Sequence, residues 1–188
     1  MTPGRARDAD IDARALAAAA RMLSAHGYDG LSVAAVAAEA GTTRQALYRR
    51  WPGKAELAAA AVESMDTTTA AHDGPPSEAL VAELEDFAAA VQRPGRLSLV
   101  GTMLQDTTDP DARERYRRRI IAPRRRRLHA ILERAKCNGL IDADADLEIA
   151  VALCTGSWYG RALATSEAPE GWARRVAAVV WRGVGGEG

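Results

Sequence analysis

The apolar residues of this chain recur every three to four positions, and no segment shows the sustained alternation that a half-buried β-strand requires. In residues 10–26, for example, Ile11, Ala15, Ala19 and Leu23 fall on one face of a helix. Hydrophobic residues make up 47% of the chain but aromatic residues only 5%, and many of the rest are Ala. Because Ala loses no side-chain entropy in a helix, the sequence predicts an all-α fold.

Gly and Pro residues divide this helical pattern into short segments. The first nine residues are expected to be a disordered arm, and Gly27 is placed to end the first helix. A Thr-, Gly- and Pro-rich stretch, residues 67–79, is the best candidate for a linker. The helices predicted after the first one cover residues 33–40, 44–50, 54–65, 77–92, 95–106, 109–121, 123–137, 145–165 and 169–184.

Several classes of protein are disfavoured. No apolar run has membrane-spanning length, and the first residues lack the apolar segment of a secretory signal. Cys137 and Cys154 have no metal-ligand spacing and suggest reduced thiols in a cytoplasmic protein. His26, His72 and His129 are not grouped with them. No phosphate-binding Gly loop or nucleophile elbow is present either. From these observations together we expect that the protein is not an enzyme and has no cofactor, metal or membrane partner.

The formal charges of the chain cancel, with 25 basic and 25 acidic residues, but they are unevenly distributed. Residues 1–54 carry eight Lys/Arg against five Asp/Glu. Within them, the segment GTTRQALYRRWPGK (41–54) has four cations and no acid. This distribution suggests an anionic partner for the first part of the chain.

The same segment has the pattern of a helix-turn-helix, two short helices joined at a Gly. Ser32 and Thr43 can cap the two helices, and Gly41 can take the positive φ of a sharp turn. The residues expected on the outer face of the second helix are Thr42, Thr43, Arg44, Gln45 and Tyr48. Such a helix can enter the major groove of DNA with its N-terminal residues towards the base edges.

The outward side chains have suitable chemistry for DNA. Arg can pair bidentately with guanine and Gln with adenine. Thr and Tyr hydroxyls suit phosphate oxygens, and Lys54 begins the following helix, whose free N–H groups attract phosphate. An amphipathic helix pair with a merely solvated charged face would share part of this pattern. The Gly turn, the Leu47–Tyr48 pair, the Trp51–Pro52 break and Lys54 together favour DNA.

Residues 27–62 resemble the DNA-binding domain of TetR-type (tetracycline-repressor-like) transcriptional regulators. The shared features are GY-x-G after the first helix, Ser32, Val36-Ala37, Ala40-Gly41, Leu47-Tyr48, Trp51, and K-x-E-L at 54–57. The resemblance implies that Ser32 and Thr43 contact phosphates, that Tyr48 and Lys54 clamp the DNA backbone, and that Arg44 and Gln45 read bases.

The resemblance also implies an organisation for the whole chain. Residues 1–53 would hold the arm and the helix-turn-helix, and residues 54–188 a connecting helix and a helical ligand-binding and dimerisation domain. The expected function is that of a homodimeric repressor released from operator DNA by an unidentified small molecule. A transcriptional activator or a ligand-independent regulator of the same fold is the alternative.

Two further sets of residues are candidates within the second part. Those for a dimer interface are Leu147, Leu153, Gly156, Gly160, Trp172, Val176 and Val179. On periodicity alone an intramolecular core explains them equally well; the resemblance favours the interface. Those for an effector pocket are Phe87, Val100, Met103, Leu104, Tyr116, His129, Trp158 and Tyr159, each of which could instead be an ordinary core residue.

Residues 113–127 contain nine Arg and one Glu. Pro123 suits the first turn of a helix, which would place Arg124 to Arg127 at its positive end, where cations are disfavoured. Something anionic should therefore offset these charges. Acidic neighbours are the favoured answer, with Glu83, Glu85, Asp86, Asp109 and Asp111 as candidates. An anionic effector or a second DNA contact is the alternative.

Overall fold

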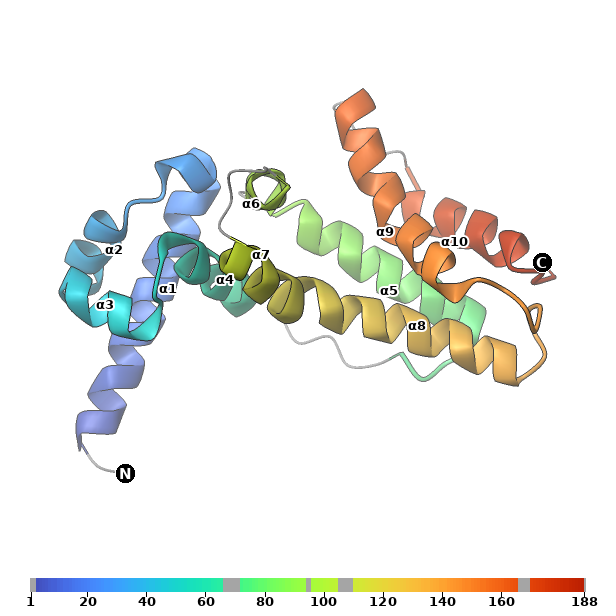
Figure 1. Ribbon diagram of the computed structural model, residues 1–188, viewed down its shortest axis with the longest axis horizontal. Coiled ribbons are helices and arrows are strands. Elements are labelled where there is room, and N and C mark those ends of the chain that lie inside the picture. Colours follow the sequence, from blue (N-terminus) through green and yellow to red (C-terminus); the bar gives the residue numbers. More distant parts are fainter. Residues whose placement is uncertain (1–2, 66–71, 94–95, 105–109, 166–169, 188) are drawn as a thin grey trace. The chain divides into compact units, whose positions relative to one another are not determined.

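The computed structural model describes residues 3–65, 72–93, 96–104, 110–165 and 170–187, and every regular element in these ranges is helical (Figure 1). The elements are α1 (Pro3–Gly30), α2 (Val33–Ala40), α3 (Arg44–Arg50), α4 (Lys54–Met65), α5 (Pro76–Val91), α6 (Arg96–Met103), α7 (Pro110–Tyr116), the π-helical η1 (Arg117–Ile121), α8 (Ala122–Cys137), α9 (Leu147–Ala164) and α10 (Trp172–Gly183). The predicted all-α fold is confirmed. None of the described helices combines the length and the apolarity needed to cross a membrane.

The helices form two compact units. The first, unit 1, contains α1 to α4, α6, α7 and η1, and the second, unit 2, contains α5, α8, α9 and α10. Helix α4 packs on α1 within unit 1, so packing does not separate the chain at residue 53. The expected division of roles between residues 1–53 and 54–188 stays a prediction.

The helices around the predicted turn have the predicted bounds, because their ends are set by local hydrogen bonds. Ser32 Oγ accepts a bond from the N–H of Ala35 at 3.3 Å and begins α2. Thr43 Oγ1 accepts one from the N–H of Ala46 at 3.1 Å and begins α3. Each hydroxyl satisfies one of the N–H groups that a helix start leaves unpaired.

The start of the chain differs from the prediction, because residues 3–9 are helical instead of a disordered arm. Pro3 occupies the first helical position, where its fixed φ suits a helix and its missing N–H costs nothing. Gly27 breaks the helix with a φ of 67°, as predicted, and one more turn follows before Leu31. Part of the predicted linker, residues 67–71, lies outside the described residues. Its last four residues begin α5, which opens at Pro76.

Pro123 does not start a separate helix, which corrects the expectation from sequence. The helix continues without a break from α7 through η1 into α8, and Pro123 is the second residue after the π-helical stretch. A proline ring clashes with the carbonyl four residues before it, and the wider π turn makes room for it. Arg124 to Arg127 therefore do not lie at a free helix start, and the argument from the helix dipole does not apply.

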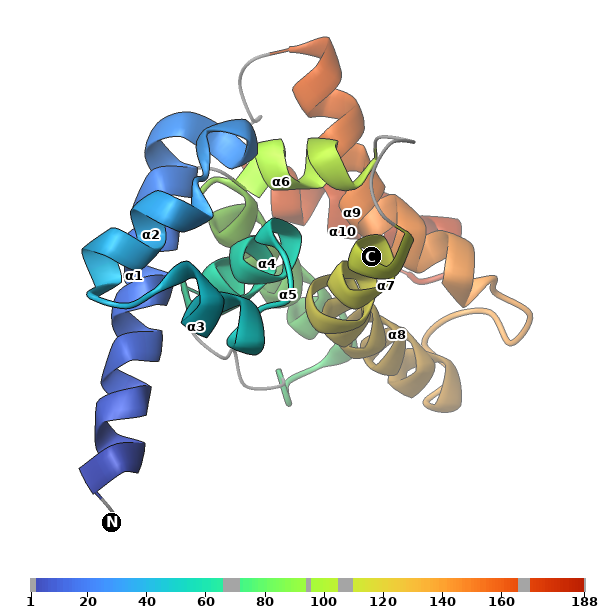
Figure 2. The same ribbon diagram turned by 60° about the vertical axis from the view of Figure 1, so that its left-hand side comes forward.

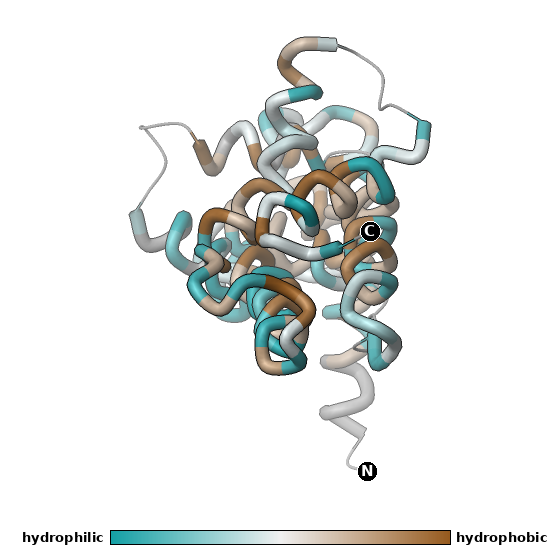
Figure 3. The backbone as a smooth tube through the Cα atoms, turned by 90° about the vertical axis from the view of Figure 1, so that its right-hand side faces the viewer, coloured by the Kyte–Doolittle hydropathy of each residue, from teal (hydrophilic) through white to brown (hydrophobic). Residues whose placement is uncertain are grey.

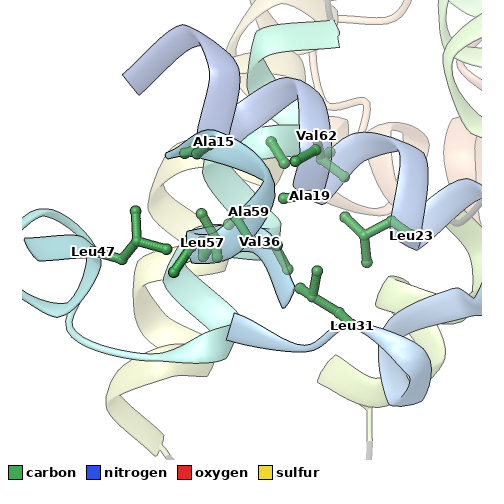
Figure 4. Close-up of a cluster of buried hydrophobic side chains, with 14 of the residues drawn as sticks. Ala15, Ala19, Leu23, Leu31, Val36, Leu47, Leu57, Ala59 and Val62 are labelled. Atoms are coloured by element: carbon green, nitrogen blue, oxygen red, sulfur yellow. The ribbon is translucent and has the colours of Figure 1, made fainter. Parts of the chain in front are cut away.

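The core of unit 1 is built from small and branched side chains of α1, α2, α3 and α4 (Figure 4). Ala15, Ala19 and Leu23 of α1 are fully buried and meet Val36 of α2 and Val62 of α4. Alanines at the crossing of α1 and α4 allow the two backbones to approach closely. Helix α2 packs on α1, and α3 packs on α2 (Figures 1 and 2).

Unit 2 combines an aliphatic core with a cluster of aromatic rings. Leu80 and Leu84 of α5 and Leu128 and Leu132 of α8 are fully buried. Phe87 lies with its ring centroid 6.2 Å from that of Trp158, 5.9 Å from that of Tyr159 and 5.8 Å from that of Trp172. Along the helices apolar and polar segments alternate, as expected for helices with one buried face (Figure 3).

Candidate nucleic-acid interface

The turn between α2 and α3 has a defined geometry. Gly41 adopts the left-handed conformation, with φ 67° and ψ 39°. Its N–H donates to the carbonyl of Ala38 at 3.2 Å, and the N–H of Thr42 donates to that of Ala37 at 2.9 Å. These two bonds form a Schellman motif, which ends α2 and turns the chain sharply. Because non-Gly residues rarely adopt this conformation, Gly41 determines how α3 leaves the turn.

Helix α3 has one face in the core and one face in solvent. Leu47 is 1% exposed and belongs to the core of unit 1. Ser32, Thr43, Arg44, Gln45 and Tyr48 are exposed, and Thr42 is partly buried. The helix-turn-helix therefore presents polar hydroxyl, guanidinium and amide groups together, as the sequence predicts.

The four cations of residues 41–54 have different environments, a distinction that the sequence did not indicate. Arg50 Nε lies 2.5 Å from Asp12 Oδ1 of α1, and its NH1 donates to the carbonyl of Ala46 at 3.2 Å. Arg50 thus ties the end of α3 to α1. Arg44 and Arg49 are exposed and make no ion pair with any residue that the structure describes. They are the charges of α3 that remain available to an anion.

Lys54 connects the first turn of α4 to the end of α1. Its Nζ donates to the carbonyl of Asp29 at 3.0 Å and lies 4.8 Å from the centroid of the Tyr28 ring. Burial raises the pKa of Tyr28, and the carboxylates of Glu56 and Asp29 raise it further. An ammonium group has three donors, so the bond to Asp29 leaves others for a second acceptor.

The candidates for an effector pocket fall in different units. Phe87, His129, Trp158 and Tyr159 belong to unit 2, and the structure brings Phe87, Trp158 and Tyr159 into one aromatic cluster. Val100, Met103 and Tyr116 pack in or against the core of unit 1, and Leu104 is exposed. The predicted set is thus divided between the aromatic cluster of unit 2 and the core of unit 1.

A buried carboxylate lies beside this cluster. Glu83 is fully buried and accepts bonds from Arg127 Nε at 2.9 Å and NH2 at 2.8 Å. Arg124 Nε lies 3.4 Å from the same carboxylate, and its guanidinium lies 5.2 Å from the centroid of the Phe87 ring. This arrangement confirms that acidic neighbours offset part of the arginine-rich stretch.

The other acidic candidates behave differently. Glu85 pairs with Arg174 and Asp86 with His72, and neither of these partners belongs to the arginine-rich stretch. Asp109 and the side chain of Asp111 lie outside the described residues. Glu148, which the sequence did not suggest, accepts a bond from Arg125 at 2.6 Å.

One group of side chains has metal-ligating chemistry. His72, Glu83 and Asp86 place potential ligand atoms within 4.8 Å of one another, and His72 Nε2 lies 2.9 Å from Asp86 Oδ2. Arg127 already binds both oxygens of Glu83. A divalent cation would have to compete with this guanidinium, so the group fits an ion-pair network better than a metal centre.

Helices α9 and α10 present an apolar face to solvent. Leu153 and Val179 are 55% and 61% exposed, and with the partly buried Val176 they line a groove of about 340 Å³. Gly156 and Gly160 are exposed on α9 with open space where a Cβ would lie. Of the other candidates for an interface, Leu147 is buried, and Trp172 is buried but lines part of the groove.

Comparisons with known proteins agree with this architecture. The family model of the bacterial regulatory proteins of the tetR family matches residues 15–61, and that of the tetracyclin repressor-like C-terminal domain matches residues 70–180. The HTH-type transcriptional regulator YdeS of Bacillus subtilis (strain 168) is 26% identical over 189 residues, which cover 96% of this chain and 93% of YdeS.

Two further similarities concern different lengths of chain. The HTH-type transcriptional regulator Rv1556 of Mycobacterium tuberculosis (strain ATCC 25618 / H37Rv) is 56% identical over 46 residues, 24% of this chain and 23% of that protein. The matched region is thus less than a quarter of that relative. The crystal structure of the TetR family transcription regulator SCO0332 superposes with a TM-score of 0.67 and 27% identity, covering 95% of this chain and 99% of that one.

Proposed function

The chain belongs to the TetR family of DNA-binding transcriptional regulators, and we propose that it acts as a homodimeric repressor that a small molecule releases from operator DNA. The exposed face of α3, held by the Gly41 turn and the Thr43 cap, is the observation on which the proposal mainly rests. The fold and the family are those of transcription regulators and not of enzymes. Since it acts on operator DNA, we expect the protein in the cytoplasm.

In this proposal α3 lies in the major groove. Arg44 and Gln45, at its exposed N-terminal end, read base edges, and each good bidentate pair discriminates by about 1–3 kcal/mol. The hydroxyls of Ser32, Thr42, Thr43 and Tyr48 bind phosphate oxygens and fix the register. Lys54 adds a phosphate contact with the donors that Asp29 does not use.

Two recognition helices are needed for a specific site. A dimeric helix-turn-helix protein binds half-sites about 34–36 Å apart, or a multiple of that spacing. The apolar face of α9 and α10 supports dimerisation, because apolar side chains of this size are exposed there beside glycines that allow close approach of a second backbone. With two helices from each subunit the interface would be a four-helix arrangement.

The effector is proposed to bind in unit 2. The cluster of Phe87, Trp158 and Tyr159 offers aromatic surface, and Arg124 lies over one of its rings. Small-molecule sites commonly combine apolar walls with a few polar groups in this way.

Selection of bound fragments from random duplex DNA tests the DNA-binding mode, and an imperfect inverted repeat is the expected product. Gln45→Ala should relax the preference at one base pair of each half-site. Tyr48→Phe should weaken binding to all sequences alike, because phosphate contacts carry no sequence information. If the purified protein bound no double-stranded DNA at low ionic strength without added small molecules, the proposal would be wrong.

Sedimentation of the free protein tests the proposed interface. Val179→Glu places a charge on the exposed apolar face, and we expect it to convert dimers to monomers at micromolar concentration. Ala130→Glu is the matched control, because Ala130 is an exposed residue of α8 in the same unit. Equal sedimentation of both variants and the wild-type protein would show that dimers do not form through this face.

A further inference from the structure

The arginine-rich stretch is only partly neutralised. Glu83 holds Arg124 and Arg127, and Glu148 holds Arg125. Glu114 lies 4.0 Å from Arg117 and 3.7 Å from Arg118. Two other arginines of this stretch, Arg119 of η1 and Arg126 of α8, are exposed and have no acidic partner among the side chains that the structure describes.

Arg119 and Arg126 have different surroundings. Arg126 belongs to unit 2, whereas Arg119 belongs to the same compact unit as the helix-turn-helix. There Arg119 lines a cavity of about 80 Å³ together with Arg50, Trp51 and Pro52. These three residues form the end of α3 and the link to α4. Arg119 is thus placed against the C-terminal end of the recognition helix, on η1, which packs on α4.

The two arginines that line this cavity have different environments. Arg50 is neutralised by Asp12, and Glu56 is the acidic residue that lines the cavity. Arg119 and the exposed Arg49 remain on the surface at the same end of α3 without acidic partners among the described residues. Arg119 can therefore bind an anion without giving up an ion pair with any side chain that the structure describes.

We propose that Arg119 contacts a backbone phosphate of the same DNA duplex that α3 reads. The proposal rests on the DNA-binding mode given above, in which α3 lies in the major groove and Lys54, directly after the link from α3, contacts a phosphate. A duplex carries one phosphate charge per about 1.7 Å of axis, so a phosphate is available on either side of the groove. An exposed guanidinium suits that partner, because its planar fork binds two phosphate oxygens at once.

The salt dependence of DNA binding tests the contact. Affinities of the wild-type protein, Arg119→Gln and the matched control Arg126→Gln are measured over a range of salt concentrations. Two probes are used: a duplex carrying the selected inverted repeat and a duplex of random sequence. We expect Arg119→Gln to lower the slope of log K against log salt by about one unit per subunit bound, on both duplexes. Arg126→Gln should keep the wild-type slope, and Arg119→Lys should restore most of it.

The outcomes separate this contact from the proposed DNA-binding mode. If the wild-type protein binds duplex DNA and Arg119→Gln has the wild-type slope, the contact is wrong and the DNA-binding mode stands. A reduction of the slope that is equal in Arg119→Gln and Arg126→Gln also overturns it, because a general effect of charge would then explain both. If the wild-type protein binds neither duplex, both proposals are wrong. Thermal unfolding of each variant shows that the fold is kept.

Discussion

Replacing Glu83 with Gln should strongly destabilise unit 2. Glu83 is fully buried, and its carboxylate binds Arg127 through two bonds and lies beside Arg124. Gln keeps the size of the side chain but removes the charge and turns an NH2 group towards the guanidinium groups. Removing one partner of a buried ion pair costs about 3–5 kcal/mol, because the other charge stays buried without compensation.

The structure places the expected cost at the lower end of that range. The side chains of Arg127 and Arg124 are 28% and 17% exposed, so water can partly solvate both guanidinium groups once the carboxylate is neutral. We therefore expect a loss of about 3 kcal/mol in the free energy of unfolding. For a chain of this length that corresponds to a fall of roughly 6–12 °C in Tm.

Urea unfolding followed by circular dichroism measures this change, and Glu148→Gln is the control. Glu148 binds Arg125 at 2.6 Å, but its side chain is 72% exposed, so its removal should cost at most about 1 kcal/mol. If Glu83→Gln lost no more stability than Glu148→Gln, the reasoning that burial makes the Glu83 pair indispensable would be refuted.

Three further predictions concern single residues, each measured by chemical or thermal unfolding. Thr43→Ala removes the bond to the N–H of Ala46 and should lower the free energy of unfolding by about 1 kcal/mol; it should also weaken DNA binding. Thr43→Ser keeps the hydroxyl and should retain both the stability and the affinity for DNA. Gly41→Ala should cost about 1–2 kcal/mol because of its φ of 67°, while Gly101→Ala, in a helix with open space around it, should not destabilise. Burial raises the pKa of Cys154 from 9.0 to about 12. Between pH 9 and 12 the folded state therefore keeps a proton that the unfolded state loses. The free energy of unfolding should fall there by up to about 1.4 kcal/mol per pH unit. If Cys154→Ala showed the same dependence of unfolding free energy on pH, this reasoning would be contradicted.

Most of the helix-turn-helix could be predicted from the sequence because its determinants are local. A capping hydroxyl acts within three residues, as in the bond from Thr43 Oγ1 to the N–H of Ala46. A left-handed Gly acts within five, as the bonds around Gly41 show. Because all the residues involved lie within about ten positions of one another, the sequence alone predicts the bounds of α2, α3 and α4, and the structure agrees with them.

The start of α1 and the continuous helix around Pro123 could not be predicted from local signals in this way. Residues 3–9 contain charges and Ala without a clear apolar face, so periodicity gave no reason to extend the helix. Proline is common at the first position of a helix, so the sequence suggested that a helix starts at Pro123. A π-helical stretch that allows a helix to continue into a proline has no simple sequence pattern.

The sequence by itself determined the all-α fold, the turn between α2 and α3, and the residues that α3 turns outward, since helical periodicity and caps depend on near neighbours. Only the tertiary structure decided what each charge does. The pair of Glu83 and Arg127 joins residues 44 positions apart, and the sequence holds 25 acidic and 25 basic residues that could pair in many ways. Packing selects among them: it buries Glu83 beside two arginines, fixes Arg50 to Asp12, and leaves Arg119 exposed at the end of α3.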